Sequence, residues 1–150
     1  MYTYRYPRPA VTADAVVFAP NKDGRLCVLL VLRGGEPYRG CWAFPGGFMN
    51  MDEDAESCAI RELKEETGID VAHLEQVGAF SSVDRDPRGR VVTVAYCALL
   101  NRPSAVSAGD DAAEARWFQV DALPPLAFDH SEIMTAAMEK IRSHAKALNS

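Results

Sequence analysis

Apolar and polar residues follow one another in blocks along the chain, and each block predicts an element of structure. Residues 10–19 are rich in Val, Ala and Thr and predict a strand that ends at Pro20. Residues 25–32 form a nearly continuous apolar run, which is typical of a strand buried on both faces. Residues 21–24 lie between them and end in a glycine, as tight turns often do. We therefore expect an antiparallel hairpin in the centre of a sheet.

The rest of the chain predicts two helices and further strands. After a loop at 33–40 and a short segment at 41–47, the pattern predicts a helix over 52–67, strands at 77–82, 90–100 and 115–120, and a closing amphipathic helix over 131–148. Asp52, Glu53 and Asp54 would occupy the first helical turn, where the helix dipole favours negative charge. Gly68 stands where a glycine commonly closes a helix. Strands mixed with two helices predict a layered α/β/α arrangement.

Composition places the chain among ordinary globular proteins. With 150 residues, 48% of them hydrophobic and 25% charged, it is expected to form a single domain spanning residues 1–150. The apolar runs are too short to cross a bilayer, and the N-terminus lacks the apolar stretch of a secretory signal. We therefore expect a cytoplasmic protein without a membrane partner. A net charge of −5 argues against general nucleic-acid binding.

The four cysteines do not follow the spacing of a metal or disulfide framework. They are Cys27, Cys41, Cys58 and Cys97, no two of them form a C-x-x-C pair, and they are scattered over apolar segments. We expect buried free thiols rather than zinc ligands or disulfides.

Three glutamates carry the most informative pattern. Glu62, Glu65 and Glu66 stand at i, i+3 and i+4 and project from one side of the predicted helix. Two interpretations are open: a solvated helix face, or a cluster neutralised by a hard cation such as Mg²⁺ or Mn²⁺. The flanks favour the cation, because 45–47 (Pro-Gly-Gly) allows a sharp turn and a close backbone approach to a ligand. Arg61 follows Glu53 by eight residues, so the two are placed to pair.

The segment from Gly47 to Ile69 resembles the Nudix box at every defined position. The resemblance implies a Nudix-type α/β/α sandwich with a mixed central sheet. It also implies metal-assisted attack of water on a phosphorus atom, with Mg²⁺ or Mn²⁺ as cofactor. The box residues implied as metal ligands are Glu62 and Glu66, with Glu65 on the same face and a carbonyl of Gly46 or Gly47 in addition. Glu53, Arg61 and Gly68 are implied as structural residues.

The general base is not assigned by the box alone. Nudix enzymes often take it from a box glutamate, here Glu65, or from a loop outside the box. The loop 109–114 precedes a predicted strand and contains Asp110, Asp111 and Glu114. We favour Asp111 over Glu114, and a merely solvated acidic loop is the alternative.

Softer patterns resemble the ADP-ribose pyrophosphatase branch, whose members yield AMP and ribose 5-phosphate. They are residues 33–37 with 42–47, residues 84–90 leading into a strand, and residues 126–130. Arg33, Arg85, Arg88 and Arg90 are candidates to bind phosphate, and Phe44, Phe80 and Tyr96 are candidates to stack on a base. The alternatives are arginines in solvent and aromatic rings in the core. Asp129 is expected to cap the last helix.

Two other functions compete with ADP-ribose hydrolysis. One is a pyrophosphatase for normal or oxidised nucleoside triphosphates. The other is a sensor that binds ADP-ribose without turnover, but such regulators carry a C-terminal winged-helix domain, and too few residues follow Phe128 for one. The expected partner is a small nucleotide, and many relatives that cleave ADP-ribose are homodimers, so a homodimer is possible here.

Overall fold

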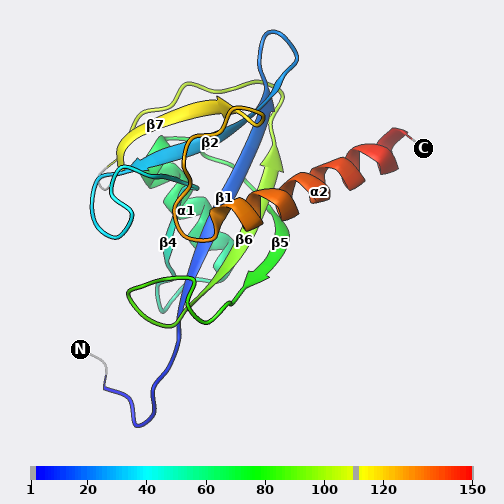
Figure 1. Cartoon of the computed structure of the whole chain (residues 1–150). Coiled ribbons are helices and arrows are strands. Elements are labelled where there is room, and N and C mark those ends of the chain that lie inside the picture. The colour runs from blue at the N-terminus through cyan, green and yellow to red at the C-terminus, as the bar shows by residue number, and fades with distance from the viewer. Residues whose placement is uncertain (1–2, 110–111, 150) are drawn as a thin grey trace.

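The computed structural model describes residues 3–109 and 112–149. In chain order the elements are β1 (Ala10–Pro20), β2 (Leu26–Arg33), β3 (Trp42–Ala43), β4 (Gly46–Phe48), α1 (Ala55–Thr67), β5 (Glu75–Phe80), β6 (Val91–Leu99), β7 (Ala112–Gln119) and α2 (His130–Asn149). The helix α1 lies behind the sheet and α2 in front of it (Figure 1). The predicted layered arrangement is confirmed.

The sheet is mixed, as predicted. Its main order is β3-β2-β1-β6-β5, while β4 pairs with β1 and β7 pairs with β2. β1 runs antiparallel to β2 and β4 and parallel to β6. The predicted hairpin of β1 and β2 is therefore confirmed, and it lies at the centre of the sheet.

β1 separates two hydrophobic cores because its side chains alternate between the two faces. Val16 and Phe18 pack with Ile133 of α2, whereas Ala15 and Val17 pack with the other core, which contains residues of α1. The helix residues that close the two cores are Cys58, Ala59 and Leu63 of α1 and Ile133, Met134 and Ala137 of α2. Burial on both faces explains why the strand has so few polar residues.

The start of α1 differs from the prediction. The helix begins at Ala55 rather than at 52, because the carboxylate of Asp54 caps it by accepting the N–H of Ser57 at 2.8 Å. Asp52, Glu53 and Asp54 therefore precede the first turn. The end agrees with the prediction, since Gly68 has φ 81° and its N–H donates to the carbonyl of Lys64.

Four strands also differ from the prediction. β5 begins and ends two residues earlier than expected and contains a bulge between Gln76 and Gly78. β7 begins at Ala112 instead of 115, because it continues to pair with the end of β2. β3 and β4 were not predicted as separate strands within the short segment at 41–47, because they are too short to produce a periodic pattern.

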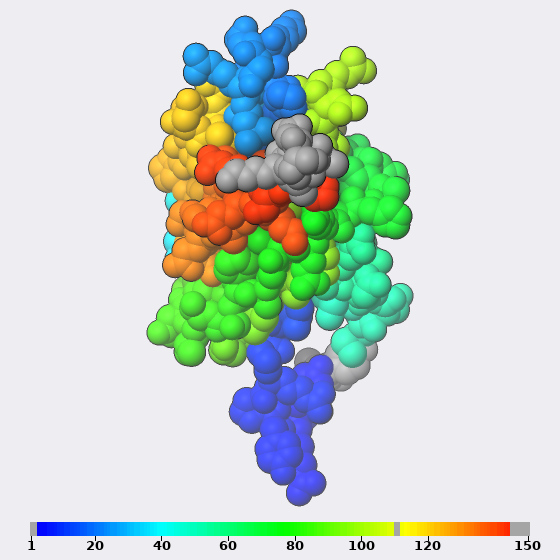
Figure 2. All heavy atoms as spheres, turned by 90° about the vertical axis from the view of Figure 1, so that its right-hand side faces the viewer, coloured from blue at the N-terminus to red at the C-terminus, as the bar shows by residue number. Residues whose placement is uncertain are grey.

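The chain ends and the thiols complete the description. Residues 3–9 are exposed and project from the body (Figure 2). Neither of the described helices is long and apolar enough to cross a membrane. All four cysteines are free thiols, with Cys27, Cys58 and Cys97 buried and Cys41 partly buried, much as expected.

Candidate active site

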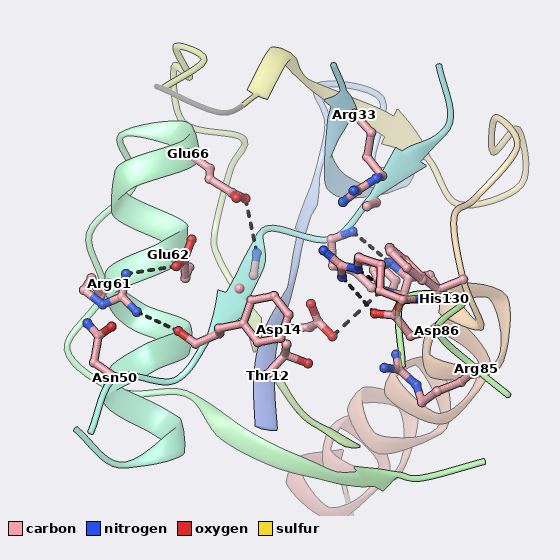
Figure 3. A pocket seen from close by; sticks show the side chains of 17 residues that line it. Thr12, Asp14, Arg33, Asn50, Arg61, Glu62, Glu66, Arg85, Asp86 and His130 are labelled. Atoms are coloured by element: carbon pink, nitrogen blue, oxygen red, sulfur yellow. Dashed lines mark hydrogen bonds and ion pairs between the residues drawn. The ribbon is translucent and has the colours of Figure 1, made fainter. Parts of the chain in front are cut away.

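A cavity of about 370 Å³ opens where β1, β4, α1 and three loops meet. Its residues come from one compact stretch, 46–66, and from distant segments around 33, 85–88 and 128–130 (Figure 3). Glu62 and Glu66 stand on one side of it, and Arg33 and Arg85 stand on the other. The cavity thus brings most of the predicted site residues together.

The three glutamates of α1 do not share one environment. Glu62 and Glu66 line the cavity, and Glu66 accepts the N–H of Gly46 at 3.2 Å. The side chain of Glu65 is 55% exposed, pairs with Arg61 at 3.2 Å and is not among the residues that line the cavity. Glu62 and Glu66 therefore face the cavity, whereas Glu65 does not line it.

The two glycines of β4 allow the strand to pass between β1 and the α1 carboxylates. A Cβ on Gly46 would lie 2.1 Å from Oδ1 of Asp14 and 2.5 Å from the carbonyl oxygen of Ala13. A Cβ on Gly47 would lie 2.5 Å from Oε1 of Glu62. Any side chain here would therefore push a carboxylate or the backbone aside.

Arg61 connects the loop before α1 to the helix. Its guanidinium donates to Glu53 at 2.6 and 2.9 Å, to Glu62 at 2.9 Å and to the carbonyl of Phe48 at 3.2 Å. The hydrogen bonds from Arg61 lower the pKa of Glu53 to about 2. The pairing expected from the eight-residue spacing is present, and it also holds Glu62 beside β4.

Arg33 and Arg88 occupy the opposite side of the cavity together with Phe128. The guanidinium of Arg33 lies 5.0 Å from the ring centroid of Phe128, and its Nε donates to the carbonyl of Pro37 at 2.7 Å. Burial lowers the pKa of Arg33, and the charge of Arg88 lowers it further. Arg88 is paired with Asp86 at 2.8 and 3.1 Å.

Arg85 is committed to an ion pair. Its Nε and Nη2 donate to the two carboxylate oxygens of Asp129 at 2.9 and 2.7 Å, and the Arg85 side chain is only 3% exposed. Although burial works against it, these hydrogen bonds raise the pKa of Arg85. Asp129 directly precedes α2, but its side chain binds Arg85 where a helix cap was expected. Because Arg85 is buried with a bidentate partner, it supports the cavity wall rather than offering a free guanidinium that could donate hydrogen bonds to a phosphate.

Phe44 belongs to the core. It is 2% exposed, and its ring stacks on His130 with centroids 5.0 Å apart. Phe80 and Tyr96 also pack with the cores. Its burial and the contact with His130 favour the core alternative for Phe44, and stacking of Phe44 on a base stays a prediction. Large apolar side chains are more often buried than exposed.

A buried polar group that the sequence did not reveal lies beneath the cavity. Asp14 accepts the hydroxyl of Thr93 at 2.6 Å, and its carboxylate lies 3.8 Å from Nε2 of His130. Nδ1 of His130 accepts the N–H of Phe44 at 3.2 Å, and burial lowers the pKa of His130. A single carboxylate inside an apolar strand was the signal for this group, since buried charges are rare without partners.

Two candidates for the general base, Glu65 and Glu114, lie within the described residues, and neither of them lines the cavity. Glu114 pairs with Arg116 on β7 and is not among the residues that line the cavity. Asp110 and Asp111 lie outside the described residues. The segment before them packs closely on α1, because the N–H of Gly109 donates to the carbonyl of Glu66 at 3.1 Å.

The donors around β4 suit a hard cation. Glu62, Glu66 and the backbone of Gly46 and Gly47 supply only oxygen, which Mg²⁺ and Mn²⁺ prefer. The carbonyl of Gly47 already accepts the thiol of Cys58 at 3.5 Å. Within residues 3–109 and 112–149, no group of three or more His, Cys, Asp or Glu side chains forms a ready-made metal cluster. The fit therefore rests on two carboxylates and the backbone beside them.

Comparison with known proteins agrees with this geometry. The family model of the NUDIX domain matches residues 8–137. The chain is 42% identical over 129 residues to an ADP-ribose pyrophosphatase of Methanocaldococcus jannaschii, which covers 86% of this chain and 73% of that protein. It is 37% identical over 145 residues to the ADPR responsive transcriptional repressor NtrR of Acinetobacter baylyi, which covers 94% of this chain but only 58% of the repressor.

A solved structure carries the same fold. The NUDIX domain of Shewanella oneidensis NrtR, crystallised with ADP ribose, superposes with a TM-score of 0.84 at 34% identity, over 91% of this chain and 90% of that one. The family model covers most of the chain, and the box residues lie together at one cavity. The chain therefore belongs to the NUDIX domain family and is a Nudix hydrolase.

Proposed function

We propose that this chain hydrolyses ADP-ribose to AMP and ribose 5-phosphate with Mg²⁺ or Mn²⁺. The observation that carries the proposal is a single cavity with Glu62 and Glu66 on one side and Arg33 and Arg88 on the other. Carboxylates suit a metal ion, and the guanidinium of Arg33 suits a phosphate that the ion would neutralise. The similarity to an ADP-ribose pyrophosphatase and to an ADP-ribose-bound NUDIX domain supports this substrate.

The roles of the residues follow from their positions. Glu62 and Glu66 would hold the metal ion together with a backbone oxygen of β4, and Arg61 would keep Glu62 in position. When bound, the ion supplies Lewis-acid stabilisation of the charge on the diphosphate. Arg33 would bind a phosphate oxygen, since its guanidinium points into the cavity (Figure 3).

The reaction adds water across one P–O bond of the anhydride. The water oxygen bonds to one phosphorus, the bridging oxygen leaves with the other phosphate, and a base accepts the proton of the water. We keep Asp111 as the proposed base. The described residues on either side support it, because Gly109 is bonded to the backbone of Glu66, and Ala112 and Glu66 line one cavity.

Sensing of ADP-ribose without turnover is the second candidate. It is favoured by the 37% identity to a repressor described as ADPR responsive. Both candidates use the same ligand and differ only in whether the anhydride is cleaved. Hydrolysis of normal or oxidised nucleoside triphosphates is the alternative within the same chemistry.

A hydrolysis panel with Mg²⁺ or Mn²⁺ separates these functions. It would contain ADP-ribose, a dinucleotide, a nucleotide sugar, and normal and oxidised nucleoside triphosphates, with products identified by chromatography. We expect AMP and ribose 5-phosphate from ADP-ribose, and no reaction in EDTA. Preference for a triphosphate would overturn the substrate, and tight binding of ADP-ribose without cleavage would establish the sensor.

A further inference from the structure

The cavity described above meets a second one of about 520 Å³. The residues that line both are Arg33, Ala43, Phe44, Gly46 and Glu66. The two cavities therefore meet along a line that contains Glu66, a proposed metal ligand, and Arg33, which is proposed to bind a phosphate. A ligand with a diphosphate at this line would extend one of its ends into each cavity.

The two cavities differ in the chemistry of their walls. Beyond the shared line, the first contains Phe48, Asp86, Arg88 and Phe128, which we call the aromatic chamber. The second contains Leu32, Gly34, Gly35, Ala112 and Ala113, which we call the small-residue chamber. Among the described residues beyond the shared line, aromatic rings line the aromatic chamber, whereas no side chain larger than leucine lines the small-residue chamber.

Arg88 lies in the aromatic chamber beside a carboxylate and two aromatic rings. Two of its nitrogens are used by Asp86, at 2.8 and 3.1 Å. Its guanidinium carbon lies 5.2 Å from the centroid of the Phe48 ring and 5.6 Å from that of Phe128. A guanidinium held in this way is suited to stacking, and Phe48 is 46% exposed, so its ring is accessible to a ligand.

Phe128 is held in an unusual backbone conformation. Its φ is +52°, a region that bulky side chains rarely adopt. The ring of Tyr38, whose φ is +61°, lies 4.8 Å from it, and the guanidinium of Arg33 lies 5.0 Å away. Strain of this kind persists where surrounding contacts hold it, and it often marks a binding site.

We propose that the aromatic chamber binds the planar base of the nucleotide and that the small-residue chamber binds the sugar at the other end of the diphosphate. This assignment rests on the proposed function, because it takes the diphosphate to lie at Glu66 and Arg33. Phe48 and Arg88 stack on the base, and its polar edge faces Asp86 and Asn50, which line the same chamber. Ala113 leaves room for the sugar.

The two halves of the proposed substrate provide the test. Binding of AMP and of ribose 5-phosphate to the full chain in Mn²⁺ is measured by calorimetry, in the wild type and in Phe48→Leu and Ala113→Leu. Both substitutions are at exposed positions, which favours folding of the variants. Phe48→Leu should weaken the binding of AMP about tenfold and leave the binding of ribose 5-phosphate unchanged. Ala113→Leu should weaken the binding of ribose 5-phosphate about tenfold and leave the binding of AMP unchanged.

Leu99→Ala is the matched control, because Leu99 is exposed at the end of β6 and lines neither cavity. The reversed pattern, equal losses in both variants, or a wild type that binds no AMP would each overturn the assignment. Failure of the proposed function gives a different result: AMP and ribose 5-phosphate bind as stated, while ADP-ribose is not cleaved.

Discussion

The two sides of the cavity are built in different ways. The side with Glu62 and Glu66 comes from one continuous stretch, residues 46–66, in which a helix and two glycines set every spacing. The opposite side combines the end of β2, the loop 84–90 and the segment before α2, and Arg85 and Asp129 are 44 residues apart. Local periodicity therefore organises one side, and long-range pairing organises the other. Chemistry is expected to depend on the first side and stability on the second.

The largest expected effect is on turnover, at Glu66. Glu66→Gln should lower kcat by about 100-fold or more, because it removes a carboxylate from the proposed metal site. The melting temperature should stay close to that of the wild type. Steady-state hydrolysis of ADP-ribose measures the effect, with Glu132→Gln on the exposed start of α2 as control. An equally large loss of kcat in Glu65→Gln would show that Glu65 also belongs to the metal site, although its side chain is exposed.

Substitutions in the Arg85–Asp129 pair, on the opposite side of the cavity, should lower the stability of the fold. Asp129→Asn removes the carboxylate that pairs with the buried Arg85 through two hydrogen bonds, and it should cost about 3 kcal/mol in the free energy of unfolding. Urea denaturation measures the free energy of unfolding. Asp84→Asn is the control, because Asp84 is exposed and lies next to Arg85 in the loop 84–90. Adding Arg85→Met should recover part of the loss, because no buried charge is then left unpaired. A loss below about 1 kcal/mol would mean that this pair does not support the cavity.

The two neighbouring glycines of β4 sharpen the comparison within one strand. In Gly47→Ala the new Cβ meets the flexible carboxylate of Glu62, so kcat should fall about tenfold or more with little loss of stability. In Gly46→Ala it meets the carbonyl of Ala13 in β1, so stability should fall by about 2 kcal/mol. Kinetics and thermal melting of both variants measure this. The same loss of stability in both would contradict the distinction.

The smallest effect concerns the Glu53–Arg61 pair and its dependence on pH. Glu53→Gln should cost about 1 kcal/mol at neutral pH and change kcat little. Because folding lowers the pKa of Glu53 from 4.5 to about 2, its contribution is complete above pH 4.5 and is lost as the pH falls towards 2. Melting curves of the wild type and the variant should therefore converge over this range. A difference that stays constant down to pH 2 would show that the carboxylate charge is not its source.

The residues of the box could be anticipated because their relations are local. An i,i+4 spacing puts Glu62 and Glu66 on one helix face whatever surrounds the helix, and the pairing of Glu53 with Arg61 spans only a loop and one and a half turns. Even here the helix start was placed three residues too early, since Asp54 serves as the cap. Acidic residues in a row do not reveal which of them ends the loop.

Relations across the fold could not be anticipated in this way. Arg85 and Arg88 look alike in the sequence, yet Arg85 is buried against Asp129, whereas the guanidinium carbon of Arg88 lies 5.2 and 5.6 Å from the ring centroids of Phe48 and Phe128. The burial of Phe44 on His130 and the link from Thr93 to Asp14 also depend on the packing of distant segments.

The sequence by itself determined the layered α/β arrangement, the central hairpin and the carboxylate face of α1. These follow from apolar runs, a turn with a glycine and the helical period of 3.6 residues, which each segment carries within itself. Only the tertiary structure decided that Glu65 stands apart from the cavity, that Asp129 binds Arg85, and that two chambers meet at Glu66. Those outcomes depend on which segments the two cores bring into contact, and no local spacing encodes such a choice.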